Sequence, residues 1–511
     1  MTPTRPEHPP RTPLREVVDW LGAEAQVSGG PPAGEVTGVT LSSRSVVPGD
    51  IYVAPQGASA HGAQYAAQAV EAGARAVLTD PTGAEICRAA GLAVPVVVVP
   101  HPRAVVGGLA ARVYGNPAEH LRLVGVTGTQ GKTTTTRLAE AALQAGGTKA
   151  AVIGTVGTRI DGVDVRSALT TPEAPDLHAL FAVMRERGVE GCAMEVSSHA
   201  LVMGRVDGVV FDVAAFTNLG RDHLDFHADV EDYFRAKAGL FTPDRARTAL
   251  VNVDDAHGRR LRDTVEVPVR TFSTAGAEAD WQAVDVEPHG TGSAFTVRHG
   301  VEEHRTSITL PGAFNVSNAL CALAILAEAG FDLATLASSL SAVPGVPGRL
   351  EPVEAGQSFL AVVDYAHKPD AVEAALTTLR AATEGRLLVV IGAGGDRDKG
   401  KRPVMGEIAA RLSDVLVVTD DNPRSEEPAA IRGEVMAGAV EVGAADRAEV
   451  HDVGDRAAAI RLAVSLAGPG DTVVVAGKGH ETGQEVAGTV HPFDDRVELR
   501  AALLEQQGAA S

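Results

Sequence analysis

The stretch from residue 116 to residue 147, NPAEHLRLVGVTGTQGKTTTTRLAEAALQAGG, places a glycine-rich loop between an apolar run and a helical segment that ends at two glycines. In such a loop, backbone amides and the N-terminus of the following helix bind phosphate oxygens. The lysine reaches the terminal phosphates, and the threonine after it can ligate Mg²⁺. Although Val126 replaces the first glycine of the strict GxxxxGK[ST] pattern, we interpret the stretch as an ATP or GTP site. Its predicted residues are Thr127, Gly128, Thr129, Gln130, Gly131, Lys132, Thr133 and Thr134.

Composition excludes several other classes of protein. The 511-residue chain carries a formal net charge of −20 and contains three widely spaced cysteines. An acidic chain lacks the basic surface that nucleic acids and anionic membranes attract, and its apolar runs are shorter than the roughly 20 residues of a membrane span. Three cysteines without CxxC pairs argue against a disulfide framework or a cysteine zinc site. We expect a soluble, cytoplasmic, monomeric protein with no signal peptide, no nucleic-acid partner and no membrane insertion.

The chain divides into three predicted α/β domains. Short β-rich runs, turn residues and a helix–strand pair predict a small domain over residues 1–120. From the glycine loop onward, apolar runs alternate with helical stretches, which is typical of a doubly wound, mostly parallel sheet. We predict this central domain over residues 121–345. A Pro/Gly-rich break, SAVPGVPGRLEPV (341–353), precedes a third domain over residues 346–511.

Four apolar runs of the third domain each end in polar, glycine-bearing residues: FLAVVDYAH, RLLVVIGAGGDRDKGKRP, DVLVVTDDNPR and DTVVVAGKGHE. In open α/β sheets, ligands bind outside the carboxyl ends of the strands. We therefore expect these four ends to face one crevice. Within DVLVVTDDNPRSEEP (414–428), a turn explains Asp421, Asn422 and Pro423, but it does not explain Arg424.

Polar side chains also follow the apolar runs of the central domain. Glu195 stands at a predicted strand end in MEVSSH (194–199). His223 and His227 are four residues apart but lack the glutamate of an HExxH zinc site, so taken alone they suggest histidines on a helix surface. Near a phosphate loop, carboxylates and imidazoles can instead serve as ligands of the metal ions that neutralise phosphate charge. Lys237, in DYFRAKAGLF (232–241), looks like a solvated surface charge.

Asn315 and Asn318 lie three residues apart before an alanine-rich helical segment, in PGAFNVSNALCALAI (311–325). One interpretation is that one of them caps the N-terminus of this helix. The other is that two amides on one helix face hold a base edge or a phosphate-bound water. The sequence leaves both open.

Together and in this order, GTQGKT, MEVSSH, RDHLD, AFNVSN, PGRLE and DYAHKPDA resemble the Mur ligases of peptidoglycan synthesis over nearly the whole chain. SSR (42–44), GGDRDKGKRP, DNPR and GKGHE narrow the resemblance to the branch that adds the third amino acid. The resemblance implies an N-terminal domain that binds the UDP-sugar-peptide, a central P-loop ATPase and a C-terminal Rossmann-like domain. It also implies that ATP phosphorylates the side-chain carboxylate of D-glutamate in UDP-MurNAc-L-Ala-D-Glu, and that an amino acid then attacks the acyl phosphate.

The resemblance assigns roles to residues that match the motifs. It implies two metal ions, taken as Mg²⁺, with Thr133 and Glu195 serving one ion and His223 the other. Lys237 matches a lysine that reacts with CO₂ to become a carbamate and a further metal ligand, which reverses its interpretation as a surface charge. The implied catalytic set is Lys132, Glu195, His223 and Lys237. Further nucleotide contacts match Asn315, Asn318, Arg349 and Asp364. Contacts to the UDP-sugar-peptide match Leu41, Ser43, Thr170, Thr171, Ser197 and Arg205.

The implied amino-acid site has the charges that diaminopimelate requires. The distal end of diaminopimelate carries both an ammonium and a carboxylate. Arg424 can bind the carboxylate with both arms of its guanidinium, and Glu481 can take the ammonium. L-lysine lacks that carboxylate and would leave Arg424 unpaired, so we expect diaminopimelate to be preferred. The matching residues are Arg397, Asp421, Asn422, Pro423, Arg424, Gly477 and Glu481.

Three alternatives remain open from the sequence. The first is a sister ligase of the same superfamily. DNPR argues against a lysine-adding ligase, and SSR with a complete N-terminal domain argues against a folylpolyglutamate synthetase. A P-loop kinase or ATPase without a ligase step would turn over ATP without an amino acid. A non-catalytic binding module would not need Lys132, Glu195, His223 and Lys237 together. The stereoisomer of diaminopimelate and the general base for its amine are not predicted.

Overall fold

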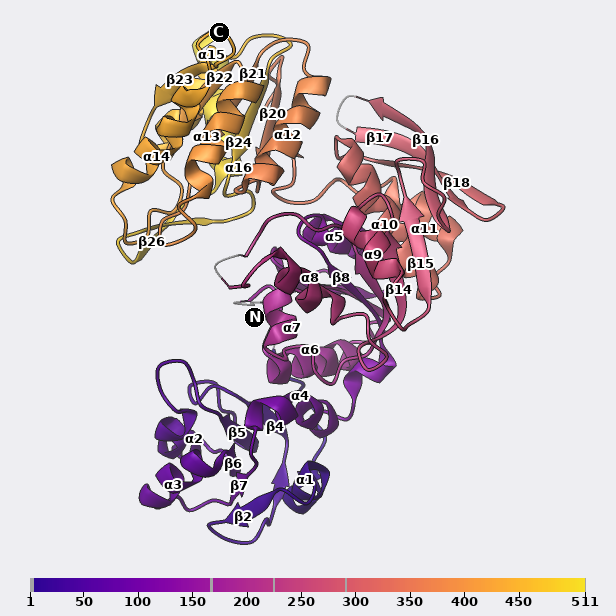
Figure 1. Ribbon diagram of the computed structural model, residues 1–511, viewed down its shortest axis with the longest axis vertical. Coiled ribbons are helices and arrows are strands. Elements are labelled where there is room, and N and C mark those ends of the chain that lie inside the picture. The colour runs from indigo at the N-terminus through magenta and orange to yellow at the C-terminus, as the bar shows by residue number, and fades with distance from the viewer. Residues whose placement is uncertain (1–3, 166–168, 224–225, 290–291, 511) are drawn as a thin grey trace.

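The computed structural model describes residues 4–165, 169–223, 226–289 and 292–510, and the chain forms three α/β bodies along its long axis (Figure 1). The first body has a five-stranded sheet that is parallel except for β2. Its strands, in spatial order, are β2 (Gln26–Ser28), β7 (Val96–Val98), β6 (Ala76–Thr79), β5 (Asp50–Ala54) and β4 (Gly38–Thr40), with a small β1 (Thr12–Pro13) and β3 (Glu35–Val36) pair beside it. Its helices are α1 (Leu14–Leu21), α2 (Ala66–Glu71), α3 (Pro81–Ala89) and α4 (Pro102–Val113).

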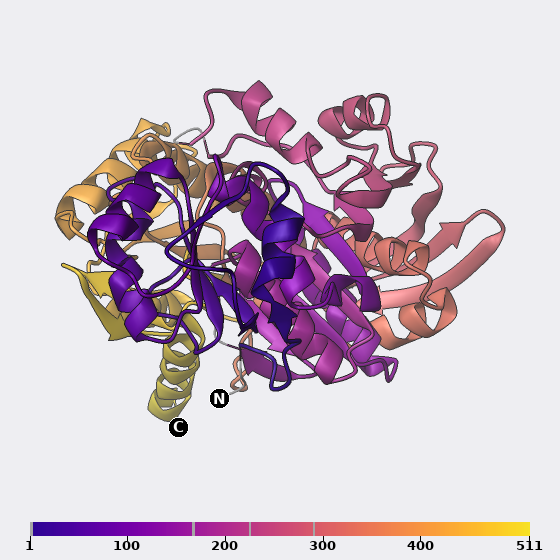
Figure 2. The ribbon, with the colours of Figure 1, turned by 90° about the horizontal axis from the view of Figure 1, so that it is seen from below.

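The second body is built on an eleven-stranded sheet. Strands β9, β12, β8, β13, β14, β15 and β16 run parallel, whereas β10, β11, β17 and β18 are antiparallel to their neighbours. The strands in spatial order are β11 (Val163–Val165), β10 (Gly157–Ile160), β9 (Ala150–Gly154), β12 (Gly191–Glu195), β8 (Arg122–Thr127), β13 (Phe211–Phe216), β14 (Ala246–Asn252), β15 (Val269–Ser273), β16 (Trp281–His289), β17 (Gly292–His299) and β18 (Glu302–Ile308). In Figures 1 and 2, β16 to β18 extend on the side away from the C-terminal body.

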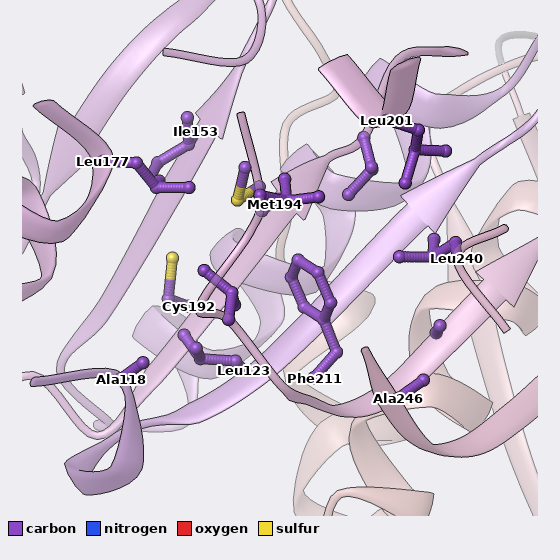
Figure 3. Packing of buried hydrophobic residues seen from close by; sticks show 14 of the residues in the cluster. Ala118, Leu123, Ile153, Leu177, Cys192, Met194, Leu201, Phe211, Leu240 and Ala246 are labelled. Atoms are coloured by element: carbon purple, nitrogen blue, oxygen red, sulfur yellow. The ribbon is translucent and has the colours of Figure 1, made fainter. Parts of the chain in front are cut away.

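Helices cover both faces of the central sheet, which explains why its middle strands are apolar throughout. On one face, α6 (Ala174–Glu186), α7 (Ser198–Val202) and α8 (Val230–Ala238) pack against a buried cluster that includes Leu123, Cys192 and Phe211 (Figure 3). Helix α9 (Ala256–Arg262) packs on β14 on the same face, where its Leu261 joins this cluster. The opposite face is covered by α5 (Lys132–Ala145), α10 (Ala313–Glu328) and α11 (Leu333–Leu340). The predicted doubly wound, mostly parallel sheet is confirmed, with antiparallel strands added at both edges.

The third body has a six-stranded sheet in the order β19 (Glu351–Pro352), β20 (Leu360–Asp364), β24 (Thr472–Ala476), β21 (Leu387–Ile391), β22 (Val415–Val418) and β23 (Glu449–Asp452). All pairs except β19–β20 are parallel, so the carboxyl ends of the four predicted strands lie at the same edge. A hairpin of β25 (Gly483–Val486) and β26 (Thr489–Pro492) follows β24. The helices are α12 (Pro369–Ala382), α13 (Lys401–Leu412), α14 (Pro428–Glu441), α15 (Arg456–Leu466) and α16 (Asp495–Ala510).

Each large sheet draws its strands from one of the three predicted ranges, which supports our proposed division of the chain at residues 120 and 345. Helix α4 of the first body packs on α6 of the second, where Arg103 lies 3.1 Å from Glu173. The segment after α11 leads into the third body, which contacts the phosphate loop. Within the described residues, no helix is both long and apolar enough to cross a bilayer.

A fully buried ion pair joins α15 to α16 in the third body. Arg456 binds Asp495 through Nε and Nη2, both at 2.7 Å, and neither side chain is exposed. Arg456 also donates to the carbonyls of Ala476, at 2.9 Å, and Asp420, at 3.5 Å. The pair therefore braces the ends of β24 and β22, from which two of the functional loops leave.

We expect Asp495→Asn to destabilise the C-terminal domain by about 3 kcal/mol, because it leaves a buried guanidinium without its counter-charge. Urea unfolding followed by circular dichroism measures this loss. The matched control is Glu231→Gln, which removes a partner from the exposed pair that Glu231 forms with Arg260. Exposed pairs contribute little to stability, so equal losses in the two variants would contradict the importance of burial.

Candidate active site

The phosphate loop lies between β8 and α5, and two of its glycines are required by its geometry. Gly131 has a φ of +86° and begins α5; a Cβ there would lie 2.4 Å from the side-chain oxygen of Asn318. Gly128 has a φ of +149°, and a Cβ there would lie 2.0 Å from Thr217 Oγ1. Only glycine adopts these conformations without strain and leaves the space empty. The loop amides can therefore approach a ligand closely.

Lys132 turns back over this loop. Its ammonium donates to the carbonyl oxygens of Gly128 at 2.7 Å and Thr129 at 3.0 Å. Burial lowers the pKa of Lys132 to about 8. A lysine held in this position meets phosphate oxygens that enter the loop, and their negative charge would restore the ordinary preference for the ammonium form.

A cavity of about 290 Å³ extends from this loop to the C-terminal domain. Thr133 and Glu195 line it from the central domain, and Arg349, Asp364 and Lys368 line it from the C-terminal side. Arg349 donates to Thr133 Oγ1 at 3.1 Å and stacks over the ring of Tyr365 at 4.8 Å. The cavity thus lies between two domains, and both supply its charges.

Asp364 ends β20 and fixes the backbone that follows. Its carboxylate accepts hydrogen bonds from the amides of Leu350 at 2.7 Å and Ala366 at 2.8 Å. Burial raises its pKa. Leu350 has a φ of +43°, and the hydrogen bond holds it in this unusual conformation. Asp364 therefore ties the linker that carries Arg349 to the sheet.

Glu195 ends β12 at the floor of the cavity and is 1% exposed. Its carboxylate accepts two hydrogen bonds from Thr155, one from the amide at 2.8 Å and one from the hydroxyl at 3.1 Å. The hydroxyl of Thr155 is in turn 3.2 Å from that of Thr170, and Thr171 donates to the backbone carbonyl of Glu195 at 2.9 Å. Thr170 and Thr171 therefore lie next to the buried carboxylate.

Lys237 is not a solvated surface charge, as its helix pattern alone suggested, because it is 1% exposed on α8. Its Nζ donates to the carbonyl of Gly128 at 2.8 Å and lies 4.5 Å from the ring centre of Tyr233. Burial, followed by repulsion from Lys132, lowers the pKa of Lys237 well below its usual value. The buried amine is therefore directed at the phosphate loop, and its surroundings disfavour the ammonium form.

Neither histidine of the predicted pair lies on a helix surface, so that interpretation is wrong. His223 lies in a loop with a φ of +53°, 3.2 Å from Asp222, and burial lowers its pKa to about 4. His227 is buried and lies 3.0 Å from Ser198 Oγ and 3.2 Å from Asp232. Asp222 also pairs with Lys368 of the C-terminal domain. Residues 224–225 of the RDHLD motif lie outside the described residues.

The capping interpretation of Asn315 and Asn318 is also wrong, because the N-cap of α10 is Gly312. Asn315 donates to the carbonyl of Pro311 at 2.8 Å, and Asn318 donates to the side-chain oxygen of Asn315 at 3.1 Å. Both line the cavity beside Gly131. Their position agrees with the alternative, in which two amides of one helix face a nucleotide.

The residues predicted to hold the UDP-sugar-peptide are divided between two domains. Leu41 and Ser43 follow β4 of the N-terminal domain, where Ser43 donates to Gln68 at 3.2 Å. Ser197 caps α7 by accepting from the amide of Ala200 at 3.1 Å. Arg205 pairs with Glu173 at 2.9 Å. Thr170, Thr171 and Ser197 are contiguous with Glu195, whereas no described hydrogen bond or ion pair connects Leu41 or Ser43 to them.

Four side chains from two C-terminal loops form a polar cluster, which we call the Lys478 cluster: Asp421, Asn422, Lys478 and Glu481. Asn422 Nδ2 donates to Glu481 Oε2 at 2.9 Å. Lys478 Nζ donates to Asn422 Oδ1 at 3.0 Å and to Glu481 Oε2 at 3.2 Å. The loops after β22 and β24 are therefore joined through side chains, as the shared sheet edge predicted.

The two predicted arginines of this region differ in their surroundings. Arg424 has a φ of +53° and donates through Nη1 to the carbonyl of Gly395 at 2.7 Å, while its Nε lies 3.5 Å from Glu485. Arg397 is exposed on the loop after β21 and makes no hydrogen bond or ion pair with described residues of the Lys478 cluster. Gly477 has a φ of +119°, and a Cβ there would lie 2.7 Å from Asp421. The glycine thus lets the two loops approach each other.

Four contributing residues were not singled out by sequence reasoning. Thr155 holds Glu195, and Lys368 pairs with Asp222. Tyr365 lies under Arg349 and within 3.5 Å of Glu481. Lys478 stands inside the quoted GKGHE motif, and a lysine between two glycines after an apolar strand was a usable signal. Tyr365 and Lys368 likewise stand inside the quoted DYAHKPDA motif. Thr155 had no such signal, because its partner Glu195 is distant in the chain.

Fold and site define a nucleotide-binding enzyme with a phosphate loop, a buried carboxylate and a polar cluster at the edge of a neighbouring domain. Family models agree along the chain: "Mur ligase family, catalytic domain" matches residues 35–114, "Mur ligase middle domain" residues 126–326, and "Mur ligase, glutamate ligase domain" residues 348–479. The chain belongs to the Mur ligase family.

Individual relatives are similar over almost their whole length. A UDP-N-acetylmuramoyl-L-alanyl-D-glutamate–2,6-diaminopimelate ligase from Streptomyces avermitilis is 55% identical over 99% of both chains. The ligase of the same name from Streptomyces coelicolor is 54% identical, also over 99% of both. A solved structure of a ligase with this name is 33% identical, with a TM-score of 0.68, and the match covers 98% of this chain and 100% of that one.

We expect Gly131→Ala to weaken ATP binding by at least about tenfold, because a residue forced to a strained positive φ costs on the order of 1–3 kcal/mol and the added methyl group meets Asn318. Isothermal titration with ATP measures the change. Gly147→Ala, just past the end of α5, is the control: its φ is +82°, and nothing lies within 4 Å of the added carbon. Equal weakening in both variants would contradict a specific role for the loop.

Proposed function

We propose that the chain is an ATP-dependent amide ligase that adds diaminopimelate to the D-glutamate side-chain carboxylate of UDP-MurNAc-L-Ala-D-Glu in peptidoglycan precursor synthesis. The carrying observation is the full-length similarity to ligases of that name, at 55% and 54% identity. The geometry supports it, because the phosphate-loop cavity lies between the central and C-terminal domains. A ligase that joins an activated carboxyl group to an amine needs its nucleotide and both substrates at one interface.

The chemistry proceeds in two steps. A carboxylate is a poor electrophile, so one of its oxygens first attacks the γ-phosphorus of ATP, and ADP leaves. The amine of diaminopimelate, after losing a proton, attacks the carbonyl carbon of the acyl phosphate, and inorganic phosphate leaves with the carbon–oxygen bond electrons. Lys132 and the loop amides hold the phosphate groups during transfer, which consists chiefly of positioning and charge neutralisation.

Two of the residues proposed to hold Mg²⁺ suit that ion in chemistry. Thr133 supplies a hydroxyl and Glu195 a carboxylate, and hard oxygen ligands are those that Mg²⁺ prefers. The imidazole of His223 is a nitrogen ligand, which is less typical of Mg²⁺. Bound Mg²⁺ would neutralise phosphate charge. The described residues hold no cluster of three or more His, Cys, Asp or Glu side chains fit for a metal ion. A carbamate on Lys237 would add the missing carboxylate beside Gly128.

Diaminopimelate fits the charges of the C-terminal loops better than lysine. Glu481 Oε2 accepts from Asn422 and Lys478, while the one hydrogen bond of Oε1 among the described residues is a 3.5 Å contact with Tyr365. We propose that Oε1 receives the distal ammonium and that Arg424 receives the distal carboxylate. Arg397, Asp421, Pro423 and Gly477 complete the proposed site. L-lysine has no distal carboxylate, so Arg424 would have no partner at that end of the ligand.

We predict that ADP release requires both UDP-MurNAc-L-Ala-D-Glu and diaminopimelate. A coupled ADP assay should give a kcat/KM for diaminopimelate on the order of a hundredfold or more above that for L-lysine, because a site with a hydrogen-bonding charge rejects an analogue that lacks the partner. Equal rates with the two amino acids would favour a lysine-adding sister ligase. ADP release without any amino acid would favour a P-loop kinase or ATPase.

We also predict that Lys237→Ala abolishes ligation while leaving the fold intact. CO₂ reacts with a neutral amine, and burial disfavours the ammonium form of Lys237. Intact-protein mass spectrometry under bicarbonate should therefore detect one added CO₂ in the wild type and none in the variant. Lys149→Ala, which removes an exposed lysine paired with Asp161, is the control and should keep full activity. Wild-type rates in Lys237→Ala would exclude the carbamate.

A further inference from the structure

The Lys478 cluster contains a buried cation for which the proposed function has not yet given a role. Lys478 is 0% exposed, although a lysine is almost never fully buried unless it is paired. It follows β24 and lies between Gly477, with a φ of +119°, and Gly479, with a φ of +54°. These two left-handed positions turn the backbone sharply on both sides of Lys478. A Cβ at Gly479 would lie 2.7 Å from Tyr365 Cβ, so the turn also packs closely on the loop after β20.

The ammonium of Lys478 has three donors and faces three acceptors. It donates to Asn422 Oδ1 at 3.0 Å and to Glu481 Oε2 at 3.2 Å, and it lies 3.7 Å from Asp421 Oδ1. Each of these acceptors belongs to the proposed amino-acid site. Lys478 therefore contacts three of the side chains proposed to recognise diaminopimelate, while its own burial keeps it away from solvent.

Lys478 and the backbone amide of Glu485 together determine which way the side-chain amide of Asn422 points. The oxygen and nitrogen of an asparagine amide are nearly equal in size, so hydrogen-bond partners decide between the two orientations. Here Oδ1 accepts from Lys478 and from the amide of Glu485 at 2.9 Å, which leaves Nδ2 to donate to Glu481 at 2.9 Å. A flipped amide would place Oδ1 against the Glu481 carboxylate. The ammonium disfavours that flip because it accepts no hydrogen bonds.

We propose that Lys478 is a positioning residue of the amino-acid site, which holds Asn422 and Glu481 so that Glu481 Oε1 is presented to the distal ammonium of the incoming amino acid. This inference rests on the proposed function of the chain as a diaminopimelate ligase. Lys478 also offsets the two carboxylates of Asp421 and Glu481. The charge of the site therefore matches a distal end that carries both an ammonium and a carboxylate, rather than a lone ammonium.

Removal of the Lys478 charge should change amino-acid recognition and little else. In Lys478→Met we expect the KM for diaminopimelate to rise roughly tenfold to a hundredfold, the range for a lost hydrogen bond to a charged group. The KM values for ATP and UDP-MurNAc-L-Ala-D-Glu should stay within about twofold of the wild-type values, which is the accuracy of such assays. Without the Lys478 charge, the carboxylates of Asp421 and Glu481 repel the distal carboxylate of diaminopimelate, which L-lysine lacks. The ratio of kcat/KM for diaminopimelate to that for lysine should therefore fall.

Companion variants separate positioning from general stability. Lys478→Gln keeps a polar side chain in case the methionine variant does not fold, and it should show the same fall in the ratio. Lys478→Arg retains the charge and should recover part of the ratio. In an Asn422→Ala background, Lys478→Met should have a smaller effect, because part of its action passes through Asn422. Lys399→Met, at an exposed lysine paired with Glu426, is the matched control and should behave as wild type.

Two results would overturn the proposal. One is an unchanged KM and ratio in both Lys478→Met and Lys478→Gln. The other is a parallel loss for all three substrates together with a lower melting temperature, which a merely structural role predicts. The wild-type enzyme separates this outcome from failure of the proposed function. If wild type requires diaminopimelate and the variants keep its KM, only the role of Lys478 is wrong. If wild type releases ADP without an amino acid, the proposed function fails as well.

Discussion

Two buried lysines converge on one carbonyl oxygen, that of Gly128, and the rest of the site is arranged around this contact. Lys132 donates to it at 2.7 Å from the start of α5, and Lys237 donates to it at 2.8 Å from α8. Burial lowers the pKa of both amines, and the charge of Lys132 lowers the pKa of Lys237 further. Two amines remain this close only where the surrounding structure holds them in place, and they then stabilise negative charge that binds beside them. Phosphate groups on the loop would supply that charge.

The constraint extends outward from the loop to the neighbouring domain. Gly128 has no side chain and therefore leaves room for Thr217, and Gly131 leaves room for Asn318 in the same way. Thr133, the second residue of α5, accepts a hydrogen bond from Arg349 of the C-terminal domain at 3.1 Å. Asp364 then ties the linker to β20. The phosphate loop and the amino-acid loops are thus connected through short polar contacts rather than through a large apolar interface.

The same sheet edge that receives Arg349 also carries the Lys478 cluster. Parallel strands β20, β24, β21 and β22 end side by side, so residues that are 59 to 116 positions apart in the chain meet there. Arg456 and Asp495 support this edge from within, since the guanidinium binds the carbonyls of Ala476 and Asp420. A buried ion pair of this kind contributes more to the positions of two loops than to net stability.

The sequence by itself determined the alternation of strands and helices in the central domain, the phosphate loop, and the family, because these depend on local periodicity and on contiguous motifs. It also located the four strand ends of the C-terminal domain. It did not predict the antiparallel strands β10, β11, β17 and β18. It failed for Lys237 and for the histidines at 223 and 227, where a helix pattern indicated solvent and the tertiary structure placed α8 against the loop. Thr155, Lys368 and Lys478 acquired their roles only from partners brought close by the fold. The physical reason is that burial and charge pairing depend on neighbours across the chain, which local sequence does not specify.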